Sequence, residues 1–498
     1  MEPEPAAPSM AAIGPALTLE FELAPAAAAR LARHPAISAA RSSRARSAAE
    51  ELIWLDGTEG ELAEAGLVLE AGPRGARRLQ RILPDGALPW LPGTPAGPAG
   101  EPEPEAAGEP APIAAFSGRH SLLPLVTPEG AVQADLLAGK LRAVAAERPV
   151  ARLRLTGPAP ALLALARQLA ADLPMLPPRA TLAEEGRALA LGAPPRPRRH
   201  GPPRLDGAAT VEEALLAAIG HLLEAMLYHA PACHPDAGPE GVHQMRVALR
   251  RLRSVLRVFR PAARCPAVED FGAGLKALAR LLGPARDWDV FLAGLGAEAA
   301  AALGPDRRIS ALLKAAEARR QAAYLALRQE LDGPGFRRLV LDGLALLLRR
   351  PWREAAEDTE RQALLSAPLP EFAARLLDRR WRKFRAEGEE IAAHSAGALH
   401  ELRLSAKRLR YAAELFAPLW PGKASRRFLK RLSRLQEELG LANDSTVARM
   451  LVGSLAGVPA WAVGAMEGFA AAQLGRVRRH ALSAWEDLML AAVFWSDS

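Results

Sequence analysis

Two basic segments that resemble each other decide the fold class of this chain. The first reads VHQMRVALRRLRSVLRVFRP (residues 242–261) and the second reads LHELRLSAKRLRYAAELFAP (residues 399–418). They align without a gap at an offset of 157 residues, from 242 to 399. The matching positions are His243 and His400, Arg246 and Arg403, Arg250 and Lys407, Arg253 and Arg410, and Phe259 and Phe416. An internal repeat of this kind predicts two related structural units.

The register continues beyond the basic segments, so the repeat covers residues 242–291 and 399–448. Phe271 then aligns with Phe428, and LGPARDWDV (residues 282–290) aligns with LGLANDSTV (residues 439–447). The surrounding sequence is rich in Ala, Leu and Arg with a period near 3.6, which is typical of packed helices. We therefore expect an all-α region of two related bundles packed about a pseudo-twofold axis.

Each basic segment should form a helix with one cationic side. Five side chains of the first segment fall within an arc of about 80° on a helix of 100° per residue. No acidic residue occurs in residues 242–261, although a solvated helix face usually alternates Glu with Lys and Arg. The second stripe has Glu401 and Glu414 at its ends. The stripes are His243, Arg246, Arg250, Arg253 and Arg257, and His400, Arg403, Lys407 and Arg410.

A cationic stripe without acidic residues indicates that an anion from outside the chain binds to it. Guanidinium groups match phosphate oxygens and remain charged at every relevant pH, so two such helices side by side would line a groove or pore for a linear polyanion. Two alternatives remain at this stage: the stripes are solvated faces or are neutralised by acidic segments such as residues 387–392, or they bind the nucleic-acid backbone. No aromatic stacking platform accompanies the stripes, and a single His among cations does not suit a metal ion.

Composition agrees with a globular protein that has anionic partners. The 498 residues are enough for two or three domains, and the net charge of +8 favours anions without selecting one. Two cysteines are too few for a disulfide framework, so we expect a reducing, cytoplasmic location. MEPEPAAPSM at the start lacks the features of a signal peptide, and Arg449 and Glu467 interrupt the apolar residues 447–474. We therefore expect neither secretion nor a membrane span.

Two low-complexity stretches divide the chain. Residues 93–112 are rich in Pro, Gly and Glu and predict a disordered loop, while APPRPRRHGPPR (residues 193–204) predicts an interdomain linker. We expect an α+β domain over residues 15–192 and a helical domain over residues 205–498. Segments of the first domain with strand patterning are residues 17–23, 51–56, 66–72 and 150–157, and a helix is expected at 160–173.

The C-terminal half resembles the CHAD family, the conserved-histidine α-helical domain, over about residues 211–490. The resemblance rests on the two basic segments, on LGPARDWDV and on LQEELGLAND (residues 435–444). It implies two four-helix bundles, binding of inorganic polyphosphate by the basic faces, and association with polyphosphate-containing granules and their components. Specific nucleic-acid recognition is not expected. Besides the two stripes, we assign to the binding surface the neighbouring Arg251 and Arg408, together with Arg379, Arg382 and Lys383 of RRWRKF (residues 379–384).

The N-terminal half resembles the CYTH or triphosphate tunnel metalloenzyme fold, a β-barrel whose chemistry needs carboxylates for metal and Lys or Arg for triphosphate. Several of these residues differ here. The opening Glu-x-Glu-x-Lys pattern is reduced to Glu20, Glu22 and Ala24, and Arg152 and Arg154 stand where Glu is expected. We therefore expect a degenerate barrel and a non-catalytic protein, a pseudoenzyme with no cofactor or metal. The alternative is a metal-dependent triphosphatase that uses Glu20 and Glu22.

Overall fold

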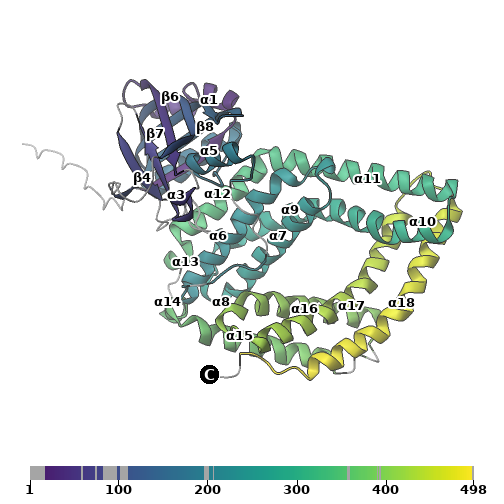
Figure 1. Cartoon of the computed structure of the whole chain (residues 1–498). Helices are drawn as coiled ribbons and strands as arrows, with labels where there is room; N and C mark the ends of the chain where they lie inside the picture. The colour runs from purple at the N-terminus through teal and green to yellow at the C-terminus, as the bar shows by residue number, and fades with distance from the viewer. Residues whose placement is uncertain are drawn as a thin grey trace, which may run out of the picture. The chain divides into compact units, whose positions relative to one another are not determined.

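The chain forms two compact units in a computed structural model (Figure 1). Unit 1 takes the chain up to Arg198 together with Asp332–Arg349, and unit 2 takes Arg199–Leu331 and Arg350–Ser498. The structure describes residues 17–57, 60–72, 76–81, 98–100, 110–195, 201–205, 207–355, 359–389, 391 and 394–495.

Unit 1 is built on an antiparallel sheet of nine described strands, in the order β5-β4-β3-β2-β6-β7-β8-β1-β9. The long strands β2, β6, β7 and β8 lie side by side in its centre, and the short strands β5 and β9 form its edges. The bounds are β1 Leu17–Leu23, β2 Arg46–Asp56, β3 Leu67–Ala71, β4 Arg77–Arg81, β5 Pro98–Gly100, β6 Ala111–Thr127, β7 Gly130–Arg142, β8 Glu147–Gly157 and β9 Met175–Leu176.

Alternating side chains give this sheet an apolar and a charged face. In β1, Phe21 is buried on one side, while Glu20 and Glu22 point to the other. The central helix α4 (Ala159–Asp172) contacts β7 and β8, and α5 (Leu182–Leu191) contacts β6 and β7. The remaining helices near the sheet are α1 (Pro25–Leu31), α2 (Pro35–Ala40) and α3 (Glu61–Glu64).

The strands expected at 17–23, 51–56, 66–72 and 150–157 and the helix at 160–173 are confirmed by β1, β2, β3, β8 and α4. The expected barrel is a curled sheet rather than a closed one, because no described residues of β5 and β9 pair with each other. Curling is evident from one buried cluster that contains Val68 of β3 together with Val150 of β8, four strands away. The sheet is consistent with a CYTH-like fold.

The expected loop at residues 93–112 is wrong in part. Pro98–Gly100 pairs with β4 as β5, and Ala111 already belongs to β6. Residues 93–97 and 101–109 lie outside the described residues, as do residues 196–200 of the expected linker.

The expected helical domain at 205–498 also needs a correction, because α12 (Pro334–Arg349) belongs to unit 1. This helix packs on α4. Arg337 donates from Nε to the carbonyl oxygen of Ala170 at 2.7 Å, and Arg167 pairs with Asp342 at 3.0 Å. The sequence pattern shows an amphipathic helix here, but it does not show which unit covers its apolar face.

Unit 2 is helical and contains two sets of four long helices. The first set is α6 (Val211–His229), α7 (Glu240–Val258), α9 (Pro266–Phe291) and α11 (Arg307–Asp332). The second set is α15 (Leu369–Glu387), α16 (Ala396–Phe416), α17 (Lys423–Gly453) and α18 (Ala460–Met489). Short elements connect them: α8 (Arg260–Ala263), a π-helical turn η4 (Leu292–Gly296), α10 (Ala297–Leu303), α13 (Pro351–Glu354) and α14 (Thr359–Ser366). The expected repeat at 242–291 and 399–448 corresponds to α7–α9 and α16–α17.

Residues that are 157 positions apart in the two sets are buried in the same way. Phe271, Leu275, Leu278 and Leu282 of α9 are buried, and so are Phe428, Leu432, Leu435 and Leu439 of α17. The two sets meet at two places (Figure 1). At one end α7 contacts α16, and at the other end a cluster around Trp288, Phe291 and Met466 joins α9, α10 and α11 to α17 and α18.

The α7–α16 contact is centred on two repeat-related rings. Phe259 and Phe416 lie 6.1 Å apart in an edge-to-face arrangement, and both contact Phe372 of α15. A residue can touch its own repeat partner only where the local twofold axis passes close to both. The axis of unit 2 therefore runs between Phe259 and Phe416.

Phe259→Ala should lower the free energy of unfolding of unit 2 by about 3–5 kcal/mol, because it leaves a cavity beside the rings of Phe372 and Phe416. Chemical denaturation followed by circular dichroism measures this change. Leu325→Ala, at an α11 side chain that is 63% exposed, is the control and should stay within about 0.5 kcal/mol of wild type. Equal effects of the two substitutions would contradict this account of the helix contact.

Candidate functional site: a basic surface on two repeat-related helices

The candidate site lies on α7 and α16, whose cationic side chains are carried opposite buried apolar ones. In α7 the packed positions Met245, Leu249 and Leu252 are buried, whereas the stripe residues are half-buried or exposed. In α16, Arg403, Lys407 and Arg410 are half-buried, and His400 is exposed. We call the combined stripes of these two helices the basic surface.

The structure brings the two stripes together. Burial and the charges of Arg246, Arg410 and Arg251 lower the pKa of Arg250, so this guanidinium lies close to cations from both helices. Its Nε atom is buried and has no hydrogen-bond partner among the described residues. A desolvated cation beside other cations is costly unless an anion joins it.

His243 is the half-buried end of the α7 stripe. Burial, followed by the positive charge of Arg286 on α9, lowers its pKa below the usual value. Arg286 was not predicted as a site residue. It stands in the quoted LGPARDWDV segment beside Asp287, and its place on the helix after the stripe is the signal that could have identified it.

Several predicted site residues already interact with protein groups. Arg251 donates from Nη1 to the carbonyl oxygen of Gly201 at 2.7 Å, and its Nη2 lies 3.3 Å from Glu414. Arg410 donates from Nε to Glu414 at 2.6 Å. Arg246 has a longer contact, with its Nη2 atom 3.9 Å from Asp287. Internal neutralisation therefore applies to part of the surface, through Glu414 for Arg251 and Arg410 and through Asp287 for Arg246.

The third predicted segment, RRWRKF on α15, is only partly directed to the basic surface. Arg382 and Lys383 are exposed, and Lys383 pairs with Glu387 one turn later at 3.6 Å. Arg380, which lies in the predicted segment but was not named as a site residue, donates from Nη1 to the carbonyl oxygen of Arg408 on α16 at 2.7 Å. The helical period could have revealed it, because Arg380 follows Leu376 by four residues and precedes Phe384 by four, on the buried face.

A buried polar network holds α9 in place behind the surface. Asp289 is 4% exposed and accepts hydrogen bonds from the Tyr324 hydroxyl at 2.8 Å and from Arg320 Nε at 2.6 Å. Both donors stand on α11. Because the charged groups are paired, this network orients the end of α9 that carries Arg286 without leaving a buried charge.

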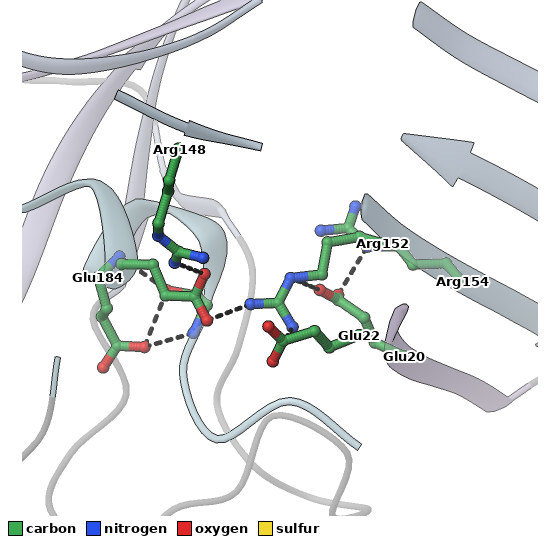
Figure 2. A network of polar contacts seen from close by, with 8 residues as sticks. Glu20, Glu22, Arg148, Arg152, Arg154 and Glu184 are labelled. Carbon is green, nitrogen blue, oxygen red and sulfur yellow. Dashed lines mark hydrogen bonds and ion pairs between the residues drawn. The ribbon is translucent and has the colours of Figure 1, made fainter. Parts of the chain in front are cut away.

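Unit 1 contains the second candidate site, and there the carboxylates are paired with arginines (Figure 2). Antiparallel register places Glu20 opposite Arg154 and Glu22 opposite Arg152. Arg154 donates from Nε to Glu20 at 2.8 Å. Arg152 is 1% exposed and lies 3.9 Å from Glu20 and 3.7 Å from Glu22.

Helix α5 completes this network. Arg152 also donates from Nη2 to Glu185, which pairs with Arg148 as well. Burial alone would lower the pKa of Arg152, but Glu185, Glu22 and Glu20 together raise it. The two carboxylates of the opening strand therefore form part of an internal ion network.

Two further observations concern the described part of the chain. None of its helices combines the length and apolar character needed to cross a bilayer. Its His, Cys, Asp and Glu side chains form no group of three or more placed to share a metal ion.

Unit 2 is thus a duplicated helical domain with one basic surface across its internal axis. Residues 217–453 match the CHAD domain family, and the chain belongs to this family. Among solved structures, it is similar to the CHAD domain from the plant Ricinus communis, with 31% identity and a TM-score of 0.48 over 59% of this chain and 98% of that one. It is also similar to PptA from Streptomyces chartreusis, with 15% identity and a TM-score of 0.43 over 56% of this chain and 100% of that one. No curated protein matches the sequence.

The lowered pKa of His243 predicts how unfolding depends on pH. The folded state favours the neutral imidazole, so this group contributes stability above its unfolded pKa, near 6.5, that is lost as pH falls through the lower folded value. Wild-type stability should therefore decrease more between about pH 6.5 and 5 than that of His243→Gln. Denaturant titrations across this range measure the difference, with His400→Gln as the matched exposed-histidine control. Parallel curves for wild type and His243→Gln would refute the assignment.

Proposed function

We propose that this chain is a non-catalytic inorganic polyphosphate-binding protein that acts at polyphosphate-containing granules in the cytoplasm. The convergence of the two stripes around Arg250 carries the proposal. Membership of the CHAD family supports polyphosphate as the anion.

The charge arrangement favours a long polyanion over a single small one. The charges of Arg246 on its own helix and Arg410 on the other lower the pKa of Arg250, and Arg410 shares Glu414 with Arg251 of α7, so the cations continue across the helix contact. A chain with about one negative charge per phosphate can follow such a row and displace counterions at each step. The gain in affinity should therefore accumulate with chain length and decrease with salt.

The ion network of unit 1 supports a non-catalytic role for the curled sheet. Metal-dependent hydrolysis of triphosphate needs carboxylates that are available to a cation and basic groups that are available to phosphate. Here Glu20 is bonded to Arg154, and the buried Arg152 lies between Glu20, Glu22 and Glu185. These ion pairs therefore occupy both the carboxylates that would bind a metal ion and the arginines that would bind phosphate.

Arg250→Ala should weaken binding of long-chain polyphosphate about tenfold, because it removes a phosphate contact that no carboxylate of the described residues offsets. The plot of log affinity against log salt should become less steep by roughly 0.7–0.9. Isothermal titration at several salt concentrations measures both quantities. Arg264→Ala is the control, since that side chain is 62% exposed and already pairs with Glu269.

Competition in the same assay separates polyphosphate from nucleic acid. Duplex DNA at equal charge concentration should compete poorly with polyphosphate. Equal competition by DNA would favour a surface that also binds the nucleic-acid backbone. If Arg250→Ala keeps wild-type affinity for polyphosphate, Arg250 does not belong to the site.

The protein should release no phosphate from tripolyphosphate with Mg²⁺ or Mn²⁺, because Arg152 and Arg154 pair with the carboxylates that would bind the ion. A colorimetric phosphate assay tests this expectation. Turnover that is abolished by Glu20→Gln and Glu22→Gln would establish the triphosphatase alternative instead.

A further inference from the structure

The basic surface is not symmetric about the internal axis. Because the axis passes between Phe259 and Phe416, it exchanges residues that differ by 157 in number. Arg251 is thus equivalent to Arg408, and Arg257 is equivalent to Glu414. The contact between Arg251 and Glu414 on one side of the axis must correspond to a contact between Arg408 and Arg257 on the other.

On the first side a carboxylate of the protein offsets part of the positive charge. Glu414 is half-buried, accepts a hydrogen bond from Arg410 and pairs with Arg251. Arg251 uses another nitrogen on the Gly201 carbonyl oxygen. These contacts occupy the guanidinium groups that would otherwise face a ligand.

On the second side an arginine replaces the carboxylate. Burial and the charges of Arg408 and Arg253 lower the pKa of Arg257, in agreement with the juxtaposition that the axis requires. Arg380 of α15 reaches the same place, because it donates to the Arg408 carbonyl oxygen. Burial and the charges of Arg257, Arg379 and Arg408 lower the pKa of Arg380 to about 10. Arg380 therefore stays mostly charged at neutral pH.

This second group has no internal counter-charge in the described part of the chain. Salt bridges involve many arginines of unit 2, but no described carboxylate lies within 4.0 Å of a cationic nitrogen of Arg253, Arg257, Arg380 or Arg408. Four guanidinium groups contributed by three helices can surround one tetrahedral oxyanion with paired donors. We call Arg253, Arg257, Arg380 and Arg408 the anchor cluster.

We propose that the anchor cluster holds one phosphate group of the bound polyanion and that Glu414 closes the equivalent position across the axis. Each chain then has a single anchor, and the two repeats make unequal contributions to binding. This proposal rests on the proposed function for the identity of the long ligand. The anchor itself requires only a phosphate group, so pyrophosphate serves as an independent probe.

Arg257→Glu tests the anchor by copying the residue of the closed side into the open side. The new carboxylate should pair with Arg408 as Glu414 pairs with Arg251, so thermal denaturation should show a fold at least as stable as wild type. Affinity for long-chain polyphosphate, measured by titration calorimetry, should fall at least tenfold, and pyrophosphate binding should be lost. Arg264→Glu makes the same change in net charge at an exposed position and should reduce affinity much less.

The reciprocal variant, Glu414→Gln, removes the closing carboxylate and frees Arg251 and Arg410. It should bind long-chain polyphosphate several-fold more tightly than Glu401→Gln, which removes the same charge from an exposed position of α16. Equal affinities of Arg257→Glu and Arg264→Glu for both ligands would overturn the anchor while leaving polyphosphate binding intact. Pyrophosphate binding that depends on Arg257, without binding of long chains, would support the anchor and refute the proposed function.

Discussion

The packing of α7 against α16 is the contact on which the rest of unit 2 depends. Phe259, Phe372 and Phe416 form its buried centre, and the local axis passes through it. Because two amphipathic helices pack there by their apolar residues, their cationic residues are forced into proximity at its margin. The hydrophobic effect thus supplies the free energy that offsets like-charge repulsion between the stripes. Binding chemistry and folding are linked through the same pair of helices.

Much of this arrangement could be predicted from the sequence because it depends on period and offset. The repeat, the helical character of unit 2 and the alternation in β1 and β8 all follow from the spacing of apolar residues. The site could be predicted less completely. Arg380 reaches the surface from a helix outside the repeat segments, and Glu414 neutralises Arg251 and Arg410 through contacts set by the tertiary packing. Spacing along one helix does not contain that information.

The two units use charge in opposite ways. In unit 1, Arg152 is almost completely buried, and carboxylates from β1 and α5 surround it, so the network stabilises the interior of the sheet. In unit 2, Arg250 and the anchor cluster have no such partners among the described residues. Arg152 and Arg154 are neutralised inside unit 1, whereas Arg257, at the position equivalent to Glu414, leaves positive charge available in unit 2.

The position of α12 has a consequence for folding during synthesis. This helix packs on α4 within unit 1, yet about 160 residues separate the two helices, and most of them belong to unit 2. At about 5–20 residues per second, the ribosome needs roughly 10–30 s to reach α12 after α4 has emerged. Throughout that interval the surface of α4 that α12 covers stays open to water and to chaperones. Separate expression of either half at residue 198 would make the same exposure permanent, so fragments should be designed to keep α12 with the sheet.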